Sequence, residues 1–128
     1  MAKYGEVAVG AVALLARNSD LSPRDGWARS VAVVIPDSES SRAKGCPLDA
    51  FLTLCEVGAV GNVAAGTYTR SVKNKAYVTR ALSALRSDPS LADDQQRLWQ
   101  VATAGEEKRP NYQMEVLTTL WNRGLIRR

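Results

Sequence analysis

Apolar residues recur at every third or fourth position in six stretches of the chain, the spacing that buries one stripe of a helix against a core. In the second stretch Trp27, Val31 and Ile35 follow this spacing, and Pro36 ends it. The predicted helices cover residues 3–17, 23–35, 47–57, 72–86, 91–104 and 111–123. The sequence therefore predicts a mainly α fold, a single compact domain of about six helices over residues 1–128.

Capping residues mark several predicted helix ends. Ser22 and Ser71 stand at the N-cap positions of the second and fourth helices, and Ser90 with Asp93 has the spacing of a capping box for the fifth. Gly58 follows the last turn of the third helix, where a left-handed residue commonly ends a helix. The polar residues 37–45 predict a loop or one short turn.

Residues 61–69 (GNVAAGTYT) are rich in turn formers, and a small β-hairpin or wing near residues 59–69 stays open at this stage. A helix followed by a wing is the order found in winged-helix proteins, in which the preceding helix enters the major groove. Asp49 and Glu56 would then face phosphates. We therefore do not expect this helix to read bases.

Two segments of the chain echo each other. Residues 53–60 (TLCEVGAV) align with residues 119–126 (TLWNRGLI) at an offset of 66, and a Trp-containing helix precedes each. One interpretation is an ancient duplication of a helix pair. The other is that any buried helix with a glycine cap has this pattern.

Composition removes several kinds of chemistry. The chain contains no histidine and two cysteines, which excludes Ser-His and Cys-His catalysis and a zinc site built on His ligands. In one helix, Cys46 and Cys55 would stand roughly 13 Å apart, too far for a disulfide. We expect reduced thiols, a cytoplasmic location, no metal, no cofactor and no membrane partner. The apolar run at residues 7–16 is too short to span a bilayer.

Positive charge is concentrated in the second half of the chain. The net charge is +4 overall, and residues 65–128 hold eleven basic and six acidic groups. Three cations, Arg70, Lys73 and Lys75, lie between Tyr68 and Tyr77 near a predicted helix start, where cations are unfavourable for the helix dipole, and Arg80 follows one turn later. The predicted basic ridge consists of Arg42, Lys44, Arg70, Lys73, Lys75 and Arg80. These cations would bind phosphates while Tyr68 stacks on a base.

The stretch around Lys44, Gly45 and Cys46 is the second candidate site. With Cys46 at a helix N-cap beside cations, free backbone N–H groups would lower the thiol pKa or hold an anion. The structural alternative is a tight turn whose cysteine packs beneath Pro47. Covalent catalysis would also lack a histidine base.

Several short motifs, taken together and in order, resemble a family of small, mostly bacterial proteins of uncharacterised function. They are residues 3–6 (KYGE), 44–47 (KGCP), 73–77 (KNKAY) and 124–126 (GLI). The Lys-Gly-Cys-Pro block is the most specific of them. The resemblance implies a single compact domain and brings with it no catalytic residue and no cofactor.

The interpretation favoured by these observations is a small helical binding module without catalysis that contacts nucleic-acid phosphates through the basic ridge. One alternative is a protein-interaction module, a regulator or inhibitor in a bacterial or phage setting, that binds an acidic partner surface. A third is an enzyme with Cys46 as its nucleophile.

Overall fold

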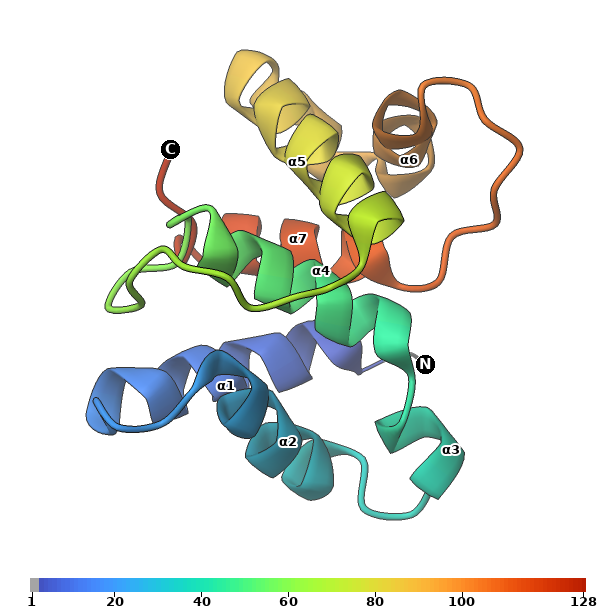
Figure 1. The fold of residues 1–128 in the computed structure, drawn as a ribbon. Coiled ribbons are helices and arrows are strands. Elements are labelled where there is room, and N and C mark those ends of the chain that lie inside the picture. Colours follow the sequence, from blue (N-terminus) through green and yellow to red (C-terminus); the bar gives the residue numbers. More distant parts are fainter. Residues whose placement is uncertain (1–2) are drawn as a thin grey trace.

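Seven α-helices and one 3-10 turn form residues 3–128, the part of the chain that the computed structural model describes (Figure 1). In chain order the elements are α1 (Tyr4–Arg17), α2 (Pro23–Val34), α3 (Glu39–Arg42), α4 (Gly45–Glu56), α5 (Val72–Ser87), η1 (Pro89–Asp93), α6 (Gln95–Thr103) and α7 (Gln113–Asn122). Six of the helices have nine residues or more, and α3 is a single turn. The prediction of a mainly α fold is confirmed.

Local capping sets most helix ends as the sequence predicts. The Ser22 hydroxyl accepts a hydrogen bond from the Asp25 N–H at 3.1 Å, and the Ser71 hydroxyl accepts one from the Asn74 N–H at 3.2 Å. Gly58 has a φ of 75°, the left-handed geometry of a helix C-terminus.

Two predicted helix starts are wrong. The capping box at residues 90–93 does not form, because the Asp88 carboxylate accepts the Ser90 N–H at 3.2 Å and residues 89–93 become a 3-10 turn. Asp94 then caps α6 by accepting the Arg97 N–H at 3.1 Å. Cys46 is not an N-cap either: α4 already begins at Gly45, and the extended Lys44 is its N-cap.

The hairpin left open at residues 59–69 is absent from the described structure. Val60 instead forms an isolated antiparallel bridge with Ile126. The Tyr68 and Thr69 N–H groups donate to the Glu56 carboxylate at 2.8 and 3.2 Å. A carboxylate thus satisfies the backbone groups that a partner strand would satisfy in a hairpin.

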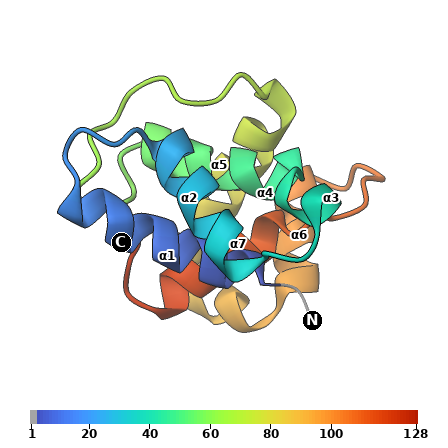
Figure 2. The same ribbon diagram turned by 90° about the horizontal axis from the view of Figure 1, so that it is seen from below.

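The helices form three layers (Figure 1). The middle layer contains α4 and α7, the layer of α5 and α6 lies above it in this view, and α1, α2 and α3 lie below. Figure 2, seen from below, shows α1 and α2 lying across the middle layer. Residues 50–55 of α4 are all 0% exposed, so α4 is buried on every side. A helix covered in this way cannot enter a DNA groove, which removes the winged-helix reading.

The two echoing segments occupy equivalent places. Val60 and Ile126, which pair across the bridge, are aligned residues of the echo. Gly58 and Gly124 end α4 and α7 with φ values of 75° and 71°. The residue after each glycine donates its N–H to a carbonyl of the preceding helix. Ala59 donates to Leu54 at 3.0 Å, and Leu125 donates to Leu120 at 2.9 Å. Antiparallel pairing of equivalent residues is what a local two-fold axis produces, and it fits the duplication interpretation.

Glycines in α1 allow close helix crossings. A Cβ at Gly5 would stand 2.7 Å from the Thr119 Cβ of α7, and one at Gly10 would overlap the Ser30 hydroxyl of α2. That hydroxyl donates to the Val7 carbonyl at 2.7 Å, a bond that requires close approach. The glycines that weaken α1 as an isolated helix therefore fix its position in the fold.

We expect Gly5→Ala to lower the free energy of unfolding by about 1–3 kcal/mol, because the added methyl overlaps Thr119. Gly45→Ala is the matched control, since no atom lies within 4 Å of the added methyl there. Adding Thr119→Ala to Gly5→Ala should restore only part of the loss, because alanine at position 119 keeps the Cβ that stands 2.7 Å from the added methyl. Urea unfolding measures all three variants, and equal stability of the two single variants would contradict the close crossing.

Candidate functional site

A polar network holds the starts of α4 and α5 side by side. Thr69 donates to the Asp49 carboxylate at 3.0 Å, and the Asn74 amide lies 3.6 Å from the Cys46 sulfur and 3.5 Å from Asp49. From α7, the Gln113 amide donates to the Asn74 oxygen at 3.1 Å. Two segments that the sequence marked as separate candidate sites thus lie side by side, joined by these hydrogen bonds.

Glu56 forms a second connection between the end of α4 and the segment that leads into α5. Its carboxylate accepts the two backbone N–H groups of residues 68 and 69 and forms an ion pair with Lys75 at 2.6 Å. The hydrogen bond from Lys75 and those from the backbone hold the pKa of Glu56 below its ordinary value, although partial burial opposes this shift. Lys75 therefore already has an anionic partner within the protein.

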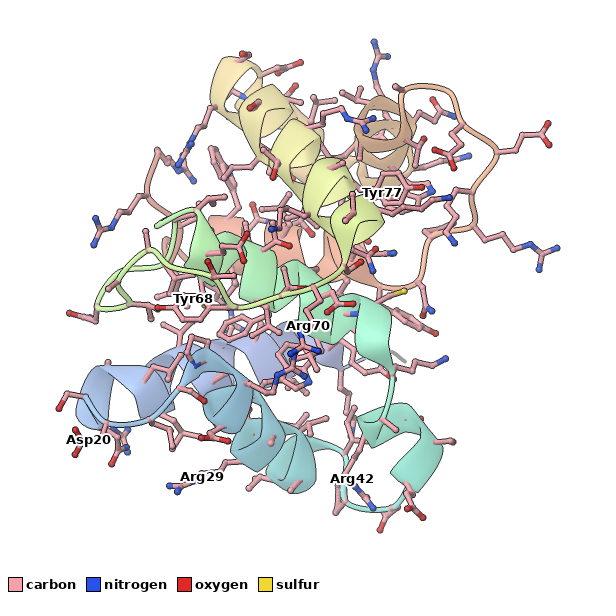
Figure 3. The ribbon with its side chains drawn as sticks, viewed as in Figure 1. Asp20, Arg29, Arg42, Tyr68, Arg70 and Tyr77 are labelled. Carbon is pink, nitrogen blue, oxygen red and sulfur yellow. The ribbon has the colours of Figure 1, made fainter. Side chains whose placement is uncertain are left out.

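Other cations of the basic ridge also have intramolecular acceptors. Arg42 donates to the carbonyls of Ile35 and Pro36 at 3.0 and 2.7 Å. Arg80 donates to the Ala102 carbonyl at 2.9 Å, and the Lys73 ammonium lies 3.9 Å from the Glu106 carboxylate. Figure 3 shows Arg42 on the lower layer and Arg70 in front of the middle layer. The six cations do not converge on one ridge.

Tyr68 and Arg70 border a separate hollow of about 540 Å³ beside Arg24. The Tyr68 hydroxyl donates to the Ala64 carbonyl at 2.6 Å, so this ring is tied to its own loop. Arg70 is exposed (Figure 3). Arg24 and Arg70 make this hollow basic, but Tyr68, the residue predicted to stack on a base, already forms a hydrogen bond within its own loop.

The starts of α4 and α7 share a hollow of about 450 Å³ that we call the basic hollow. It is lined by Lys44, Cys46, Lys108, Arg109, Pro110, Asn111 and Tyr112. No acidic residue of the described chain lines it. Gly45 is exposed beside it. The sequence pointed to Lys44, Gly45 and Cys46 but not to the loop residues that complete the site.

A signal for the missed residues is present in the sequence. Cys46 and Tyr112 are 66 positions apart, the offset of the internal echo. Because α4 and α7 run in the same direction in Figure 1, their starts meet as their ends do. The offset of 66 was visible in the sequence, but only the parallel course of α4 and α7 turns it into a neighbour relation between Tyr112 and Cys46.

The loop that carries Lys108 and Arg109 is held at several points. The Tyr77 hydroxyl lies 3.2 Å from the Glu106 carboxylate, and the Trp99 indole N–H donates to the Lys108 carbonyl at 2.7 Å. Tyr77 and Trp99 also contact each other edge to face, with ring centroids 5.3 Å apart. The two cations thus project from an anchored backbone.

Tyr112 lies where three hollows meet. The residue is 41% exposed, and its ring centroid is 4.8 Å from that of Tyr4. Its φ is 67°, a left-handed conformation that costs an L-residue roughly 1–2 kcal/mol. The fold therefore holds an aromatic ring at the surface in a strained conformation, a feature that clusters at functional sites.

The two cysteines differ in their surroundings, and both are free thiols. Burial raises the pKa of Cys55 to about 12, which leaves it unreactive at neutral pH. Cys46 is half-buried, and its sulfur contacts the Asn74 amide, which donates and is not a base. Within residues 3–128 no cluster of three potential metal ligands occurs. No helix of this part of the chain is long and apolar enough to cross a membrane.

A family model described as a family of unknown function matches residues 1–127. The chain belongs to this family, DUF6979. The resemblance to a family of uncharacterised function is thereby confirmed, whereas its bacterial distribution and the Lys-Gly-Cys-Pro block as its mark stay predictions. No curated protein and no solved structure matches the chain.

In this DUF6979 chain, Glu56→Gln should lower the free energy of unfolding at pH 7 by about 1 kcal/mol, because the charge-assisted bond to Lys75 is lost. The folded-state pKa of Glu56 lies below its ordinary value of 4.5, so its carboxylate stabilises the fold above that pH. This contribution disappears as the pH falls through the folded-state pKa. Urea unfolding between pH 3 and 7 should show a smaller acid-induced loss for the variant than for the wild type; equal losses would contradict the role of Glu56.

We expect Tyr112→Gly to be more stable than Tyr112→Ala by about 1 kcal/mol, because both remove the ring and only alanine keeps the left-handed penalty. Thermal unfolding of the two variants measures this difference. An alanine variant as stable as the glycine variant would show that residue 112 leaves the left-handed region once its ring is gone.

Proposed function

We propose that this protein is a binding module without catalysis that contacts nucleic acid through its phosphate groups. The observation that carries the proposal is the basic hollow, in which Lys44, Lys108 and Arg109 surround a depression without a lining carboxylate. Lysine and arginine around a concave surface are the groups that bind phosphate oxygens.

Neighbouring cations extend this basic surface. The Lys73 side chain is 76% exposed beside the start of α4, and its contact with Glu106 is long and open to solvent. Such a pair contributes little to stability and exchanges readily for a phosphate contact. Arg70 with Arg24 borders a second basic hollow. The contribution of Lys75 and Arg80, which have acceptors within the protein, stays a prediction.

The site's chemistry supports binding over catalysis. A cysteine nucleophile is commonly activated by a neighbouring base, and the amide that contacts Cys46 supplies a proton donor instead. The chain has no histidine to take that part. The cytoplasmic location expected from two unpaired thiols belongs to the same proposal.

The salt dependence of binding to a short single-stranded RNA tests the proposal. Each phosphate contact with a single strand contributes about 0.7 to the log–log slope. The double variant Lys108→Ala/Arg109→Ala should therefore lower the slope by about 1.4 and weaken binding most at low salt. Fluorescence anisotropy at several salt concentrations gives both values.

The double variant Arg17→Ala/Arg29→Ala is the matched control. It removes the same charge from exposed positions of α1 and α2 that do not line the basic hollow. We expect its slope to equal that of the wild type. A protein that is folded but binds no nucleic acid at low salt would overturn the proposal and favour an acidic protein partner. Equal loss in both double variants would mean that net charge alone drives binding.

A further inference from the structure

We infer that the hollows on either side of Tyr112 form one nucleotide site, with a phosphate in the basic hollow and a nucleobase in the hollow between α6 and α7. The inference rests on the proposed function and names the unit that is recognised. Its chemical class is a planar heteroaromatic base joined through a sugar to an anionic phosphate.

The proposed base site is a hollow of about 690 Å³, which we call the α6–α7 hollow. This volume is within the range of about 300–1,000 Å³ that is usual for small-molecule sites. Trp99 and Met114 contribute its apolar lining, and both are almost fully buried. The flat face of a base would therefore pack against side chains that the fold already holds in place.

Amide side chains of α6 supply polar groups suited to base edges. Gln95, Gln96 and Gln100 line the α6–α7 hollow. The Gln95 amide nitrogen donates to the Thr118 hydroxyl at 3.2 Å, which fixes that side chain and leaves its oxygen as an acceptor. Gln96 and Gln100 are exposed at the rim. A primary amide offers both donors and acceptors, as the edges of bases do.

Tyr112 joins the two halves of the site. It lines both the α6–α7 hollow and the basic hollow, and Pro110 lies at the same junction. Tyr112 is exposed, and its ring packs on that of Tyr4. Stacking of a base on an exposed aromatic ring is the usual way in which proteins hold unpaired nucleotides. The left-handed backbone keeps this ring at the junction.

The two halves of the proposed site differ in charge, as the two parts of a nucleotide do. Lys44, Lys108 and Arg109 line the phosphate half. Glu115 lines the base half, where its carboxylate accepts the Gly5 N–H at 3.0 Å. Glu106 lies near Lys73, away from the lining of both hollows. A phosphate is thus attracted to one side of Tyr112 and repelled from the other.

Calorimetric titrations with AMP, ribose 5-phosphate and inorganic phosphate test the site in the full chain. AMP should bind at least tenfold more tightly than ribose 5-phosphate. Tyr112→Ala should weaken AMP binding about tenfold with little effect on ribose 5-phosphate, and Tyr112→Phe should restore it. Lys108→Ala/Arg109→Ala should weaken all three ligands, whereas Arg17→Ala/Arg29→Ala should weaken none. Circular dichroism checks that each variant is folded.

An eight-nucleotide single-stranded RNA distinguishes a free nucleotide from a nucleotide within a strand as the ligand of the site. Tighter binding of AMP than of the RNA assigns a free nucleotide, and the reverse assigns one unit of a strand. RNA binding that depends on Lys108 and Arg109 but not on Tyr112, with equal affinity for AMP and ribose 5-phosphate, would overturn this inference and leave the proposed function intact. AMP binding that depends on Tyr112 without RNA binding would instead overturn the proposed function and leave the site.

Discussion

The pairing of Val60 with Ile126 closes the C-terminal ends of α4 and α7 against each other, and the remaining helices are arranged around this pair. Both helices end in a left-handed glycine that turns the chain back to the bridge. The burial of α4 on every side follows, because α2, α5 and α7 all pack on it. Both helices of this central pair therefore contribute fully buried side chains to the core, among them Phe51 of α4 and Leu117 of α7.

The same pairing creates the candidate site. Because α4 and α7 run side by side in the same direction, the residues that precede the two helices also lie close together. This explains why Lys44 and Tyr112 line a common hollow. Side chains with acidic groups close to this region are used internally: Asp49 and Glu56 accept hydrogen bonds from the segment before α5. The cations of the loop before α7 then face a hollow that no carboxylate of residues 3–128 lines.

Helix number, most helix ends and much of the core could be predicted from periodicity and capping, because these signals are local. The starts of α4 and α6 could not. Asp88 accepts the Ser90 N–H that the predicted capping box needs, and the extended backbone at Lys44 places the N-cap of α4 two positions before Cys46. The hairpin prediction failed because Glu56, the last residue of α4, accepts the N–H groups of Tyr68 and Thr69 from the loop that follows. Of the site, the sequence located Lys44, Gly45 and Cys46.

Counting cations along the chain could not separate binding groups from structural ones, because that distinction depends on distant acceptors. Arg42 and Arg80 satisfy carbonyl groups near helix ends, and Lys75 compensates a partly buried carboxylate, so a phosphate would have to displace contacts that the fold already makes. Lys108 and Arg109 are held by their backbone, through the bond from Trp99 to the Lys108 carbonyl. Anchoring a loop through its main chain leaves the charged side chains available to a ligand. That difference, more than the number of positive charges, places the candidate site before α7 and not along the start of α5.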